Sequence, residues 1–100
     1  MTVYVDSARI PATVGRRHGH WSHLTADTQD ELHAFAERLG LRRAWFQAGK
    51  SYSGRPSVGW HYDVTDDLRA QALALGAQPV TMRDLAAILR GRRSAIQADQ

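Results

Sequence analysis

One segment of the chain carries a nearly complete set of helix signals, and it constrains the fold more than any other feature. Thr28 and Glu31 have the spacing of a capping box, in which two side chains satisfy free backbone N–H groups at a helix start. Gly40 supplies a stop signal. Between them, apolar residues recur every three or four positions, as on the buried face of a helix: Leu32, Phe35, Ala36 and Leu39. The segment predicts an amphipathic helix that packs against a core.

Two later segments carry the same kinds of helix signal. Thr65 precedes two acidic residues and a helical stretch that stops at Gly76. Thr81 and Asp84 form another capping box, and the apolar pattern behind them runs to Gly91. These signals predict a second and a third helix.

Short apolar stretches lie between the helices. We expect strands over residues 2–6, 43–47, 60–64 and 79–81, and an extended loop or edge strand over residues 9–14, which Pro11 interrupts. The segments 15–25 and 48–59 are rich in Gly and polar residues and are expected to be loops. Helices alternating with short strands predict a small single-domain α/β layer fold, with a short, mainly parallel sheet and about three helices.

The length and composition limit the class of protein. A chain of 100 residues has room for one core, so residues 1–91 are expected to form one α/β domain and residues 92–100 a flexible basic C-terminal tail. The absence of cysteine excludes disulfides and thiolate metal sites. No apolar run approaches the roughly 18 residues of a membrane span, and the N-terminus lacks the pattern of a signal peptide. A cytoplasmic protein without a membrane partner is expected.

The stretch Trp60-His61-Tyr62-Asp63 is the most informative about function. Side chains alternate between the two faces of a strand, so His61 and Asp63 share one face. An imidazole and a carboxylate placed in this way can bind one metal ion or one polar ligand together. In the alternative reading, Asp63 only precedes the second helix, which Thr65 could cap without it.

Two other residues are candidates for the same polar pocket. Asp6 ends the first predicted strand, and ligands of open α/β sheets bind beyond the carboxyl ends of the strands. His23 lies in a segment that also holds His18 and His20, and the three together match no established zinc spacing. His23 is the strongest of them because Trp21 and Leu24 could fix its backbone. We predict a pocket whose candidate catalytic residues are Asp6, His23, His61 and Asp63, with His23, His61 and Asp63 as candidate ligands of a divalent metal. In the alternative reading, Asp6 is a turn residue.

Basic residues outside this pocket could meet an anion. Lys50 and Arg55 lie in the 48–59 loop, which could act as a lid, although Ala44 stands where a phosphate-binding P-loop needs its first glycine. Arg16 and Arg17 lie in the first loop. The net charge of +3 is mild and does not by itself indicate a nucleic-acid partner.

The chain also resembles a known family through several short motifs. They are Val3-Tyr4-Val5-Asp6, Trp21-Ser22-His23-Leu24, Trp45-Phe46-Gln47 and His61-Tyr62-Asp63-Val64, and the resemblance covers most of residues 2–81. The family consists of short bacterial and bacteriophage proteins classed as a domain of unknown function. It often has a second acidic residue after the position of Asp6, where this chain has Ser7, which argues against a paired carboxylate there. The resemblance implies a compact cytoplasmic domain and no established activity.

These observations support one leading hypothesis and two alternatives. In the first, the pocket binds a divalent metal or a small phosphate-bearing molecule, and any catalysis is metal-assisted hydrolysis of a phosphoester. In the second, the chain is a non-enzymatic accessory module whose Arg-rich loop and tail (Arg90, Arg92 and Arg93) contact nucleic acid or a protein partner. In the third, the His and Asp residues only build a hydrogen-bonded core. The sequence leaves open whether the chain is an enzyme.

Overall fold

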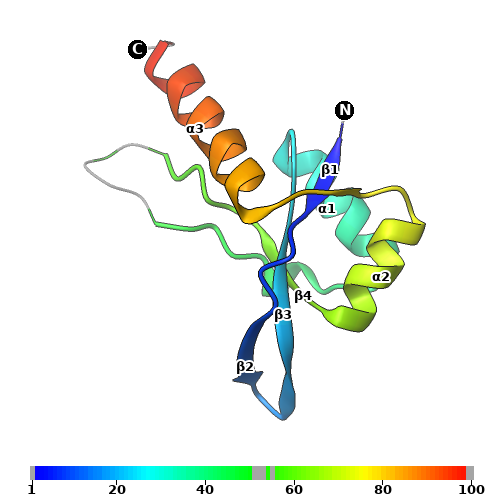
Figure 1. Cartoon of the computed structure of the whole chain (residues 1–100). Helices are drawn as coiled ribbons and strands as arrows, with labels where there is room; N and C mark the ends of the chain where they lie inside the picture. Colours follow the sequence, from blue (N-terminus) through cyan, green and yellow to red (C-terminus); the bar gives the residue numbers. More distant parts are fainter. Residues whose placement is uncertain (1, 51–53, 55, 99–100) are drawn as a thin grey trace.

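A computed structural model describes residues 2–50, 54 and 56–98 of the chain. Figure 1 shows the elements in their spatial arrangement. In chain order they are β1 (Val3–Val5), β2 (Ile10–Val14), β3 (Arg17–Ala26), α1 (Gln29–Arg38), the 3₁₀ turn η1 (Arg43–Trp45), β4 (Tyr62–Thr65), α2 (Asp66–Ala74), β5 (Gln78–Pro79) and α3 (Met82–Ala98).

The long strand β3 is the centre of the sheet. Leu24 pairs with Val5 of β1 on one edge of β3 and with Tyr62 of β4 on the other edge. The strand β2 pairs with the first half of β3 on the same edge as β1, and β5 pairs with the outer edge of β1. The sheet therefore combines residues from both halves of the chain around one strand.

The prediction of a mainly parallel sheet is wrong. Strand β3 is antiparallel to β1, β2 and β4, and among the described strands only β1 and β5 pair in parallel. The reason is the direct turn between β2 and β3, where Val14 pairs with Arg17 across Gly15 and Arg16. Gly15 has a φ of 63°, which glycine adopts readily. A chain that reverses in two residues can only form an antiparallel pair.

Two local predictions also fail. The segment 15–25 was expected to be a loop, but most of it belongs to β3. The first half of β3 is exposed and polar, so it lacks the alternation that marks a half-buried strand. Residues 43–45 form η1 instead of a strand, although Gln47 makes an isolated bridge to His61.

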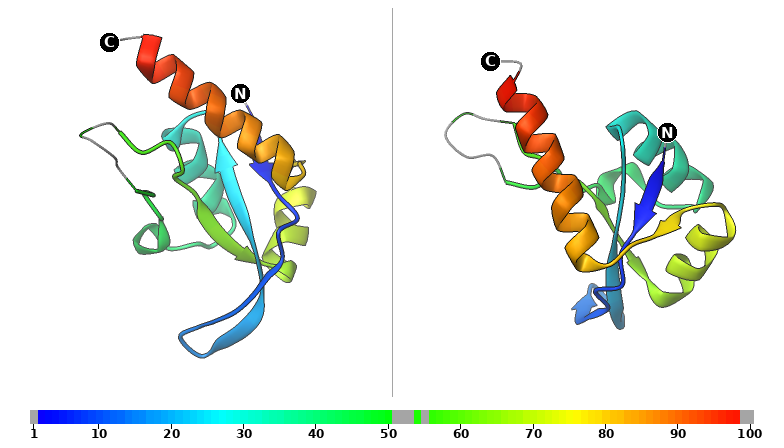
Figure 2. Two further views of the ribbon diagram at one scale, coloured as in Figure 1. Left: turned by 60° about the vertical axis from the view of Figure 1, so that its left-hand side comes forward. Right: turned by 45° about the horizontal axis from the view of Figure 1, so that its top comes forward.

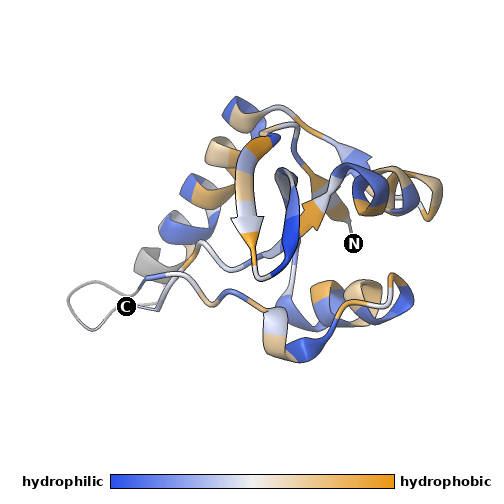
Figure 3. Cartoon of the chain, turned by 90° about the horizontal axis from the view of Figure 1, so that it is seen from below, coloured by the Kyte–Doolittle hydropathy of each residue, from blue (hydrophilic) through white to orange (hydrophobic). Residues whose placement is uncertain are grey.

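The helices cover the sheet on both faces. Helices α1 and α2 lie on one side of the strands and α3 lies on the other, as both views of Figure 2 and the view from below in Figure 3 show. The predicted cap of α1 is confirmed, because the Thr28 hydroxyl accepts a hydrogen bond from the Glu31 N–H at 3.2 Å. The predicted stripe of α1 is buried with the inner face of the sheet, in a core that includes Val5, Leu24, Leu32, Phe35, Tyr62 and Val64.

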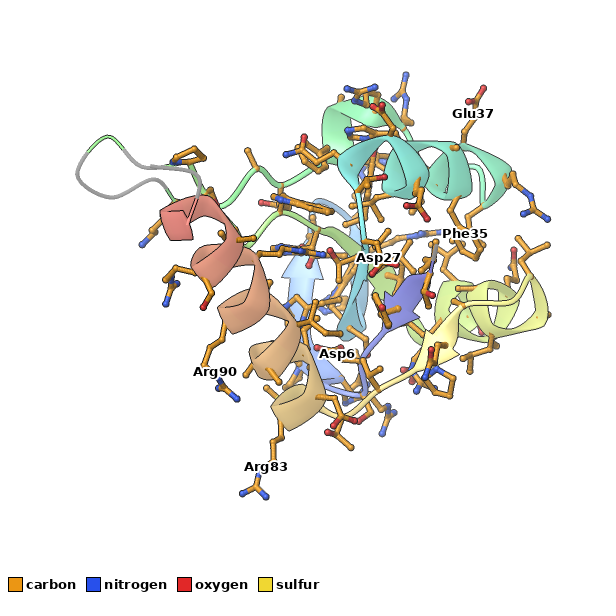
Figure 4. All side chains as sticks on the ribbon, turned by 90° about the horizontal axis from the view of Figure 1, so that it is seen from above. Asp6, Asp27, Phe35, Glu37, Arg83 and Arg90 are labelled. Atoms are coloured by element: carbon orange, nitrogen blue, oxygen red, sulfur yellow. The ribbon has the colours of Figure 1, made fainter. Side chains whose placement is uncertain are left out.

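Helix α3 includes residues 92–98 of the segment that was expected to be a flexible tail. Arg92 points toward the sheet, and its guanidinium donates hydrogen bonds to the Val58 carbonyl at 2.9 Å, the Thr25 hydroxyl at 3.0 Å and the Ala26 carbonyl. The same group lies 3.7 Å from the centre of the Trp60 ring, a cation–π geometry. In contrast, Arg83 and Arg90 point away from the protein (Figure 4). None of the helices in the described ranges has the length and apolar character needed to cross a membrane.

Candidate metal site

Three side chains converge on the sheet face that α3 covers. His23 on β3 lies directly opposite Asp63 on β4, and His61 is two residues before Asp63 and on the same face. One ligand atom from each residue can be chosen so that all three atoms lie within 4.8 Å of one another. All three residues are partly buried, which leaves them accessible to an ion. The register between β3 and β4 therefore builds the site.

His23 is held in place by Asp6, which lies just beyond β1. The Asp6 backbone N–H donates to the His23 carbonyl at 3.0 Å, so the β1–β3 ladder extends to this pair. The His23 Nδ1 atom lies 2.7 Å from Asp6 Oδ2, while Asp6 Oδ1 accepts the backbone N–H groups of His23 at 2.8 Å and Ala8 at 3.2 Å. The Asp6 side chain is buried and lies inside the molecule in Figure 4. Asp6 therefore stands behind His23 and orients its ring.

The same contacts shift the pKa of both partners. Burial acts to raise the pKa of Asp6, but hydrogen bonds from the His23 ring, the His23 N–H and the Ala8 N–H together hold it below its usual value. The hydrogen bond to Asp6 raises the pKa of His23, against the opposing effect of burial. Asp6 is therefore an ionised acceptor, so Nδ1 of His23 carries a proton and Nε2 is directed away from Asp6.

These shifts predict how the stability of the metal-free protein depends on pH. Because the pKa of His23 is raised in the folded protein, its pairing with Asp6 stabilises the fold. This stabilisation is complete below the pKa of histidine in the unfolded chain, about 6.5, and is lost as the pH rises through the raised pKa of the folded protein. The lowered pKa of Asp6 gives stabilisation that is present above the unfolded value of about 3.9 and is lost as pH falls through the lowered pKa. The pair should stabilise the fold most between about pH 4 and 6.5.

Urea unfolding of wild-type protein and a His23→Gln variant in chelator, from pH 4 to 9, measures this contribution. The difference in free energy of unfolding between the two proteins should shrink as pH rises above about 6.5. A difference that grows toward pH 9 would contradict the assignment.

His61 is oriented by a different acceptor. Its Nδ1 atom lies 2.8 Å from the carbonyl oxygen of Gly59, and because a carbonyl only accepts, Nδ1 is the donor. In the neutral ring, Nε2 then holds the lone pair, and this atom lies 3.2 Å from Asp63 Oδ1. The His23 and His61 rings are 5.0 Å apart between centroids and nearly perpendicular. Both rings therefore have Nδ1 directed at an acceptor, and Nε2 of His61 faces Asp63.

The chain matches the model of the family described as "Protein of unknown function (DUF4031)" over residues 3–92. The chain belongs to this family. This confirms the resemblance found in the sequence to a domain of unknown function. Neither the curated proteins nor the solved structures give a match. In this DUF4031 domain, the four residues Asp6, His23, His61 and Asp63 all lie inside the matched range.

The donor set of the DUF4031 domain suits one small divalent cation. Metal–nitrogen and metal–oxygen bonds of about 2.0–2.2 Å place two ligand atoms of one ion at most ~4.4 Å apart. The observed limit of 4.8 Å is close to that range, so small side-chain rotations bring the atoms to bonding distance. The 3.2 Å between His61 Nε2 and Asp63 Oδ1 already matches neighbouring ligands on one ion.

The other predicted residues lie outside this cluster. His18 and His20 are exposed on the β2–β3 hairpin, and His18 Nδ1 lies 2.6 Å from the Thr13 hydroxyl. Arg16 and Arg17 are exposed at the turn of the hairpin. Lys50 is exposed in the segment between η1 and β4, and Arg55 lies outside the described residues. The structure thus separates His18 and His20 from the four candidates that it brings together, which are Asp6, His23, His61 and Asp63.

Two supporting groups were missed by reasoning from the sequence. The Gly59 carbonyl orients His61, and the Gln47 side-chain amide lies 3.5 Å from Asp63 Oδ2. The backbone of Gln47 also exchanges two hydrogen bonds with that of His61, at 2.9 Å each. A main-chain carbonyl leaves no mark in a sequence, and Gln47 is joined to His61 by a bridge between separate segments. The one sequence signal at Gln47 was its place in the motif Trp45-Phe46-Gln47, which supports the family resemblance.

A small hollow of about 180 Å³ adjoins the two imidazoles. It lies where helix α3 crosses the sheet, and Leu85 and Leu89 of α3 form part of its wall. On the sheet side it is lined by His23, Thr25, Gly59, Trp60 and His61. The histidines therefore face a space large enough for water molecules, and its wall is mostly apolar.

Proposed function

We propose that this domain binds one divalent transition-metal ion through Nε2 of His23, Nε2 of His61 and a carboxylate oxygen of Asp63. The observation that carries the proposal is the orientation of the two rings. Histidines that bind metal ions almost always donate their second N–H to a carboxylate or a backbone carbonyl. Here, His23 donates to Asp6 and His61 donates to the Gly59 carbonyl. His61 Nε2 also lies 3.2 Å from the carboxylate of Asp63, the third proposed ligand.

The ligand types favour zinc, iron, cobalt or manganese over magnesium or calcium. Imidazole nitrogen is a preferred ligand of transition metals, whereas magnesium and calcium take oxygen ligands almost throughout. Two imidazoles and one carboxylate also leave coordination positions open, as in catalytic zinc sites and in non-haem iron sites. A structural zinc site, in contrast, is usually closed by four protein ligands.

The open positions support a hydrolytic role, and the reaction we propose is hydrolysis of a phosphoester. A metal ion in such a site lowers the pKa of a bound water and polarises a phosphoryl oxygen. The residues of the chain would supply the rest of the machinery. His23 and His61 would hold fixed directions because Asp6 and Gly59 support them, and the apolar wall of the adjoining hollow would limit access of bulk water.

Calorimetric titration of chelator-treated protein tests this function. Zinc and manganese should each bind at one site per chain, and magnesium should bind much more weakly. With the bound metal, the protein should release phosphate from a general phosphomonoester substrate. Absence of binding by any transition metal would contradict the proposal, and metal binding without hydrolysis would remove its catalytic part.

The Asp6→Asn variant tests the role of the residue behind His23. The asparagine oxygen can keep the backbone hydrogen bonds, but its NH₂ group would then face Nδ1 of His23. The ring would respond by moving its proton to Nε2, the atom needed for the metal. We expect zinc affinity to fall about 10- to 100-fold, the usual effect of losing such a partner.

A matched control is Asp67→Asn, which makes the same change at an exposed position in the first turn of α2. Its zinc affinity should equal that of the wild type. Nitrogen NMR of the imidazoles should also show the change of tautomer at His23 in Asp6→Asn only. Unchanged zinc affinity in Asp6→Asn would mean that Asp6 does not orient the ligand.

A further inference from the structure

A second, larger hollow opens on the Asp63 side of the proposed metal site. This cleft has a volume of about 390 Å³, within the range of small-molecule pockets. Its walls come from four parts of the chain: the β2–β3 hairpin, the η1 turn with the residues around it, β4 and the start of α2. Asp63 and its neighbour Gln47 both line it. The cleft and the candidate metal ligands therefore share a residue.

The cleft has aromatic walls. Trp21 and Trp45 both line it, together with aliphatic residues. Trp45 is 49% exposed, which is unfavourable for so large an apolar side chain unless something covers it. The Trp21 indole N–H donates to the Ala12 carbonyl at 3.1 Å, which ties the polar edge of this ring to the hairpin. Tryptophan faces are good stacking surfaces for flat aromatic rings.

The polar groups of the cleft are few and carry charge. Among the described residues that line the cleft, Arg17 is the one cationic side chain, and it lies at the exposed turn of the hairpin. Asp63 is the one anionic residue in the described part of the lining, and a bound divalent ion would more than neutralise its charge. With the ion in place, the cleft would present two centres of positive charge beside the tryptophans. A ligand that matches both features carries an aromatic ring and a negative charge.

We infer that the cleft binds a phosphate monoester that carries an aromatic ring, with the ring against Trp45 and the phosphate between Arg17 and the metal ion. The inference rests on the proposed metal site and names its substrate class. Two sources share this chemistry: mononucleotides, in which the base is the ring, and simple aryl phosphates. The cleft volume accommodates either one.

Calorimetry of zinc-loaded protein with adenosine monophosphate and phenyl phosphate, each as its non-hydrolysable phosphonate analogue, and with inorganic phosphate tests the inference, because the proposed hydrolysis would consume the esters themselves. Both aromatic compounds should bind about tenfold or more tightly than inorganic phosphate, as expected if one ring stacks on the protein. Tighter binding of adenosine monophosphate than of phenyl phosphate would identify a nucleotide site, and equal binding would identify an aryl phosphate site. Equal affinity for all three compounds would overturn the inference.

Variants assign the binding to the cleft. Trp45→Ala removes an exposed ring, so the fold should persist, and affinity for both aromatic compounds should fall about tenfold while inorganic phosphate and zinc bind as before. Arg17→Met should weaken all three phosphates. Met82→Ala, which changes a 57% exposed side chain on α3, is the control and should change nothing. Full aromatic affinity in Trp45→Ala would overturn the inference.

The experiment separates failure of the cleft from failure of the metal site. If zinc binds and the aromatic compounds do not, the inference falls and the metal site stands. If zinc does not bind, the same titrations on metal-free protein show whether the cleft binds the aromatic compounds without a metal ion. Aromatic binding that depends on Trp45 would then support the cleft without the metal, and its absence would overturn both.

Discussion

The His61→Ala protein is expected to bind zinc at least about 100-fold more weakly than the wild-type protein. The change removes one of three proposed ligands, so its effect should reach or exceed the 10- to 100-fold loss caused by removing a partner behind a ligand. His61 is partly exposed and lies immediately before the first residue of β4, so its truncation should leave the fold intact. Competition between the protein and a coloured chelator measures the zinc affinity.

The control for this experiment is His20→Ala. His20 is also a histidine of β3, but it is exposed and lies outside the cluster. Its removal should leave zinc affinity unchanged. If His61→Ala bound zinc as tightly as the wild type, or if His20→Ala lost as much affinity, the ligand assignment would be wrong.

The second large effect is expected for Leu24→Ala, which should lower the free energy of unfolding by about 2–5 kcal/mol. Leu24 is completely buried on the inner face of β3, at the point where this strand pairs with both β1 and β4. The cavity would lie beneath the sheet that holds His23 opposite Asp63. Urea unfolding in the presence of a chelator measures the change without a contribution from bound metal.

Two control variants show whether the loss of stability comes from the cavity at Leu24. Leu24→Met keeps the volume and should cost less than about 1.5 kcal/mol. Ile10→Ala truncates a 46% exposed side chain on β2 and should change stability by no more than about 0.5 kcal/mol. If Leu24→Ala cost no more than Ile10→Ala, the core described for the sheet would be wrong.

The helices were predictable because their signals are local. The cap at Thr28 and the stripe that includes Leu32 and Phe35 are encoded within a few residues of one another. The directions of the strands were not predictable in this way. Strand β3 takes its partners from residues 3–5, 10–14 and 62–65, and no short stretch of sequence states which of these pair or in which direction.

The candidate site was predictable in part for the same reason. Alternation along one strand was enough to place His61 and Asp63 on a common face. His23 lies opposite Asp63 because of the β3–β4 register. This register could not be predicted from the sequence, because segment 15–25, which contains His23, was expected to be a loop. Asp6 was expected to line the pocket, yet its carboxylate accepts hydrogen bonds from behind His23. Its role follows from the pairing of β1 with β3.

The most direct test of the proposed metal site is a crystal of the protein grown or soaked with zinc and measured on both sides of the zinc absorption edge. We expect one anomalous peak about 2.0–2.2 Å from His23 Nε2, His61 Nε2 and an oxygen of Asp63. The hydrogen bonds from His23 to Asp6 and from His61 to the Gly59 carbonyl should persist in that crystal. No peak among these three residues, at a zinc concentration that fills another site such as the hairpin histidines, would contradict the account.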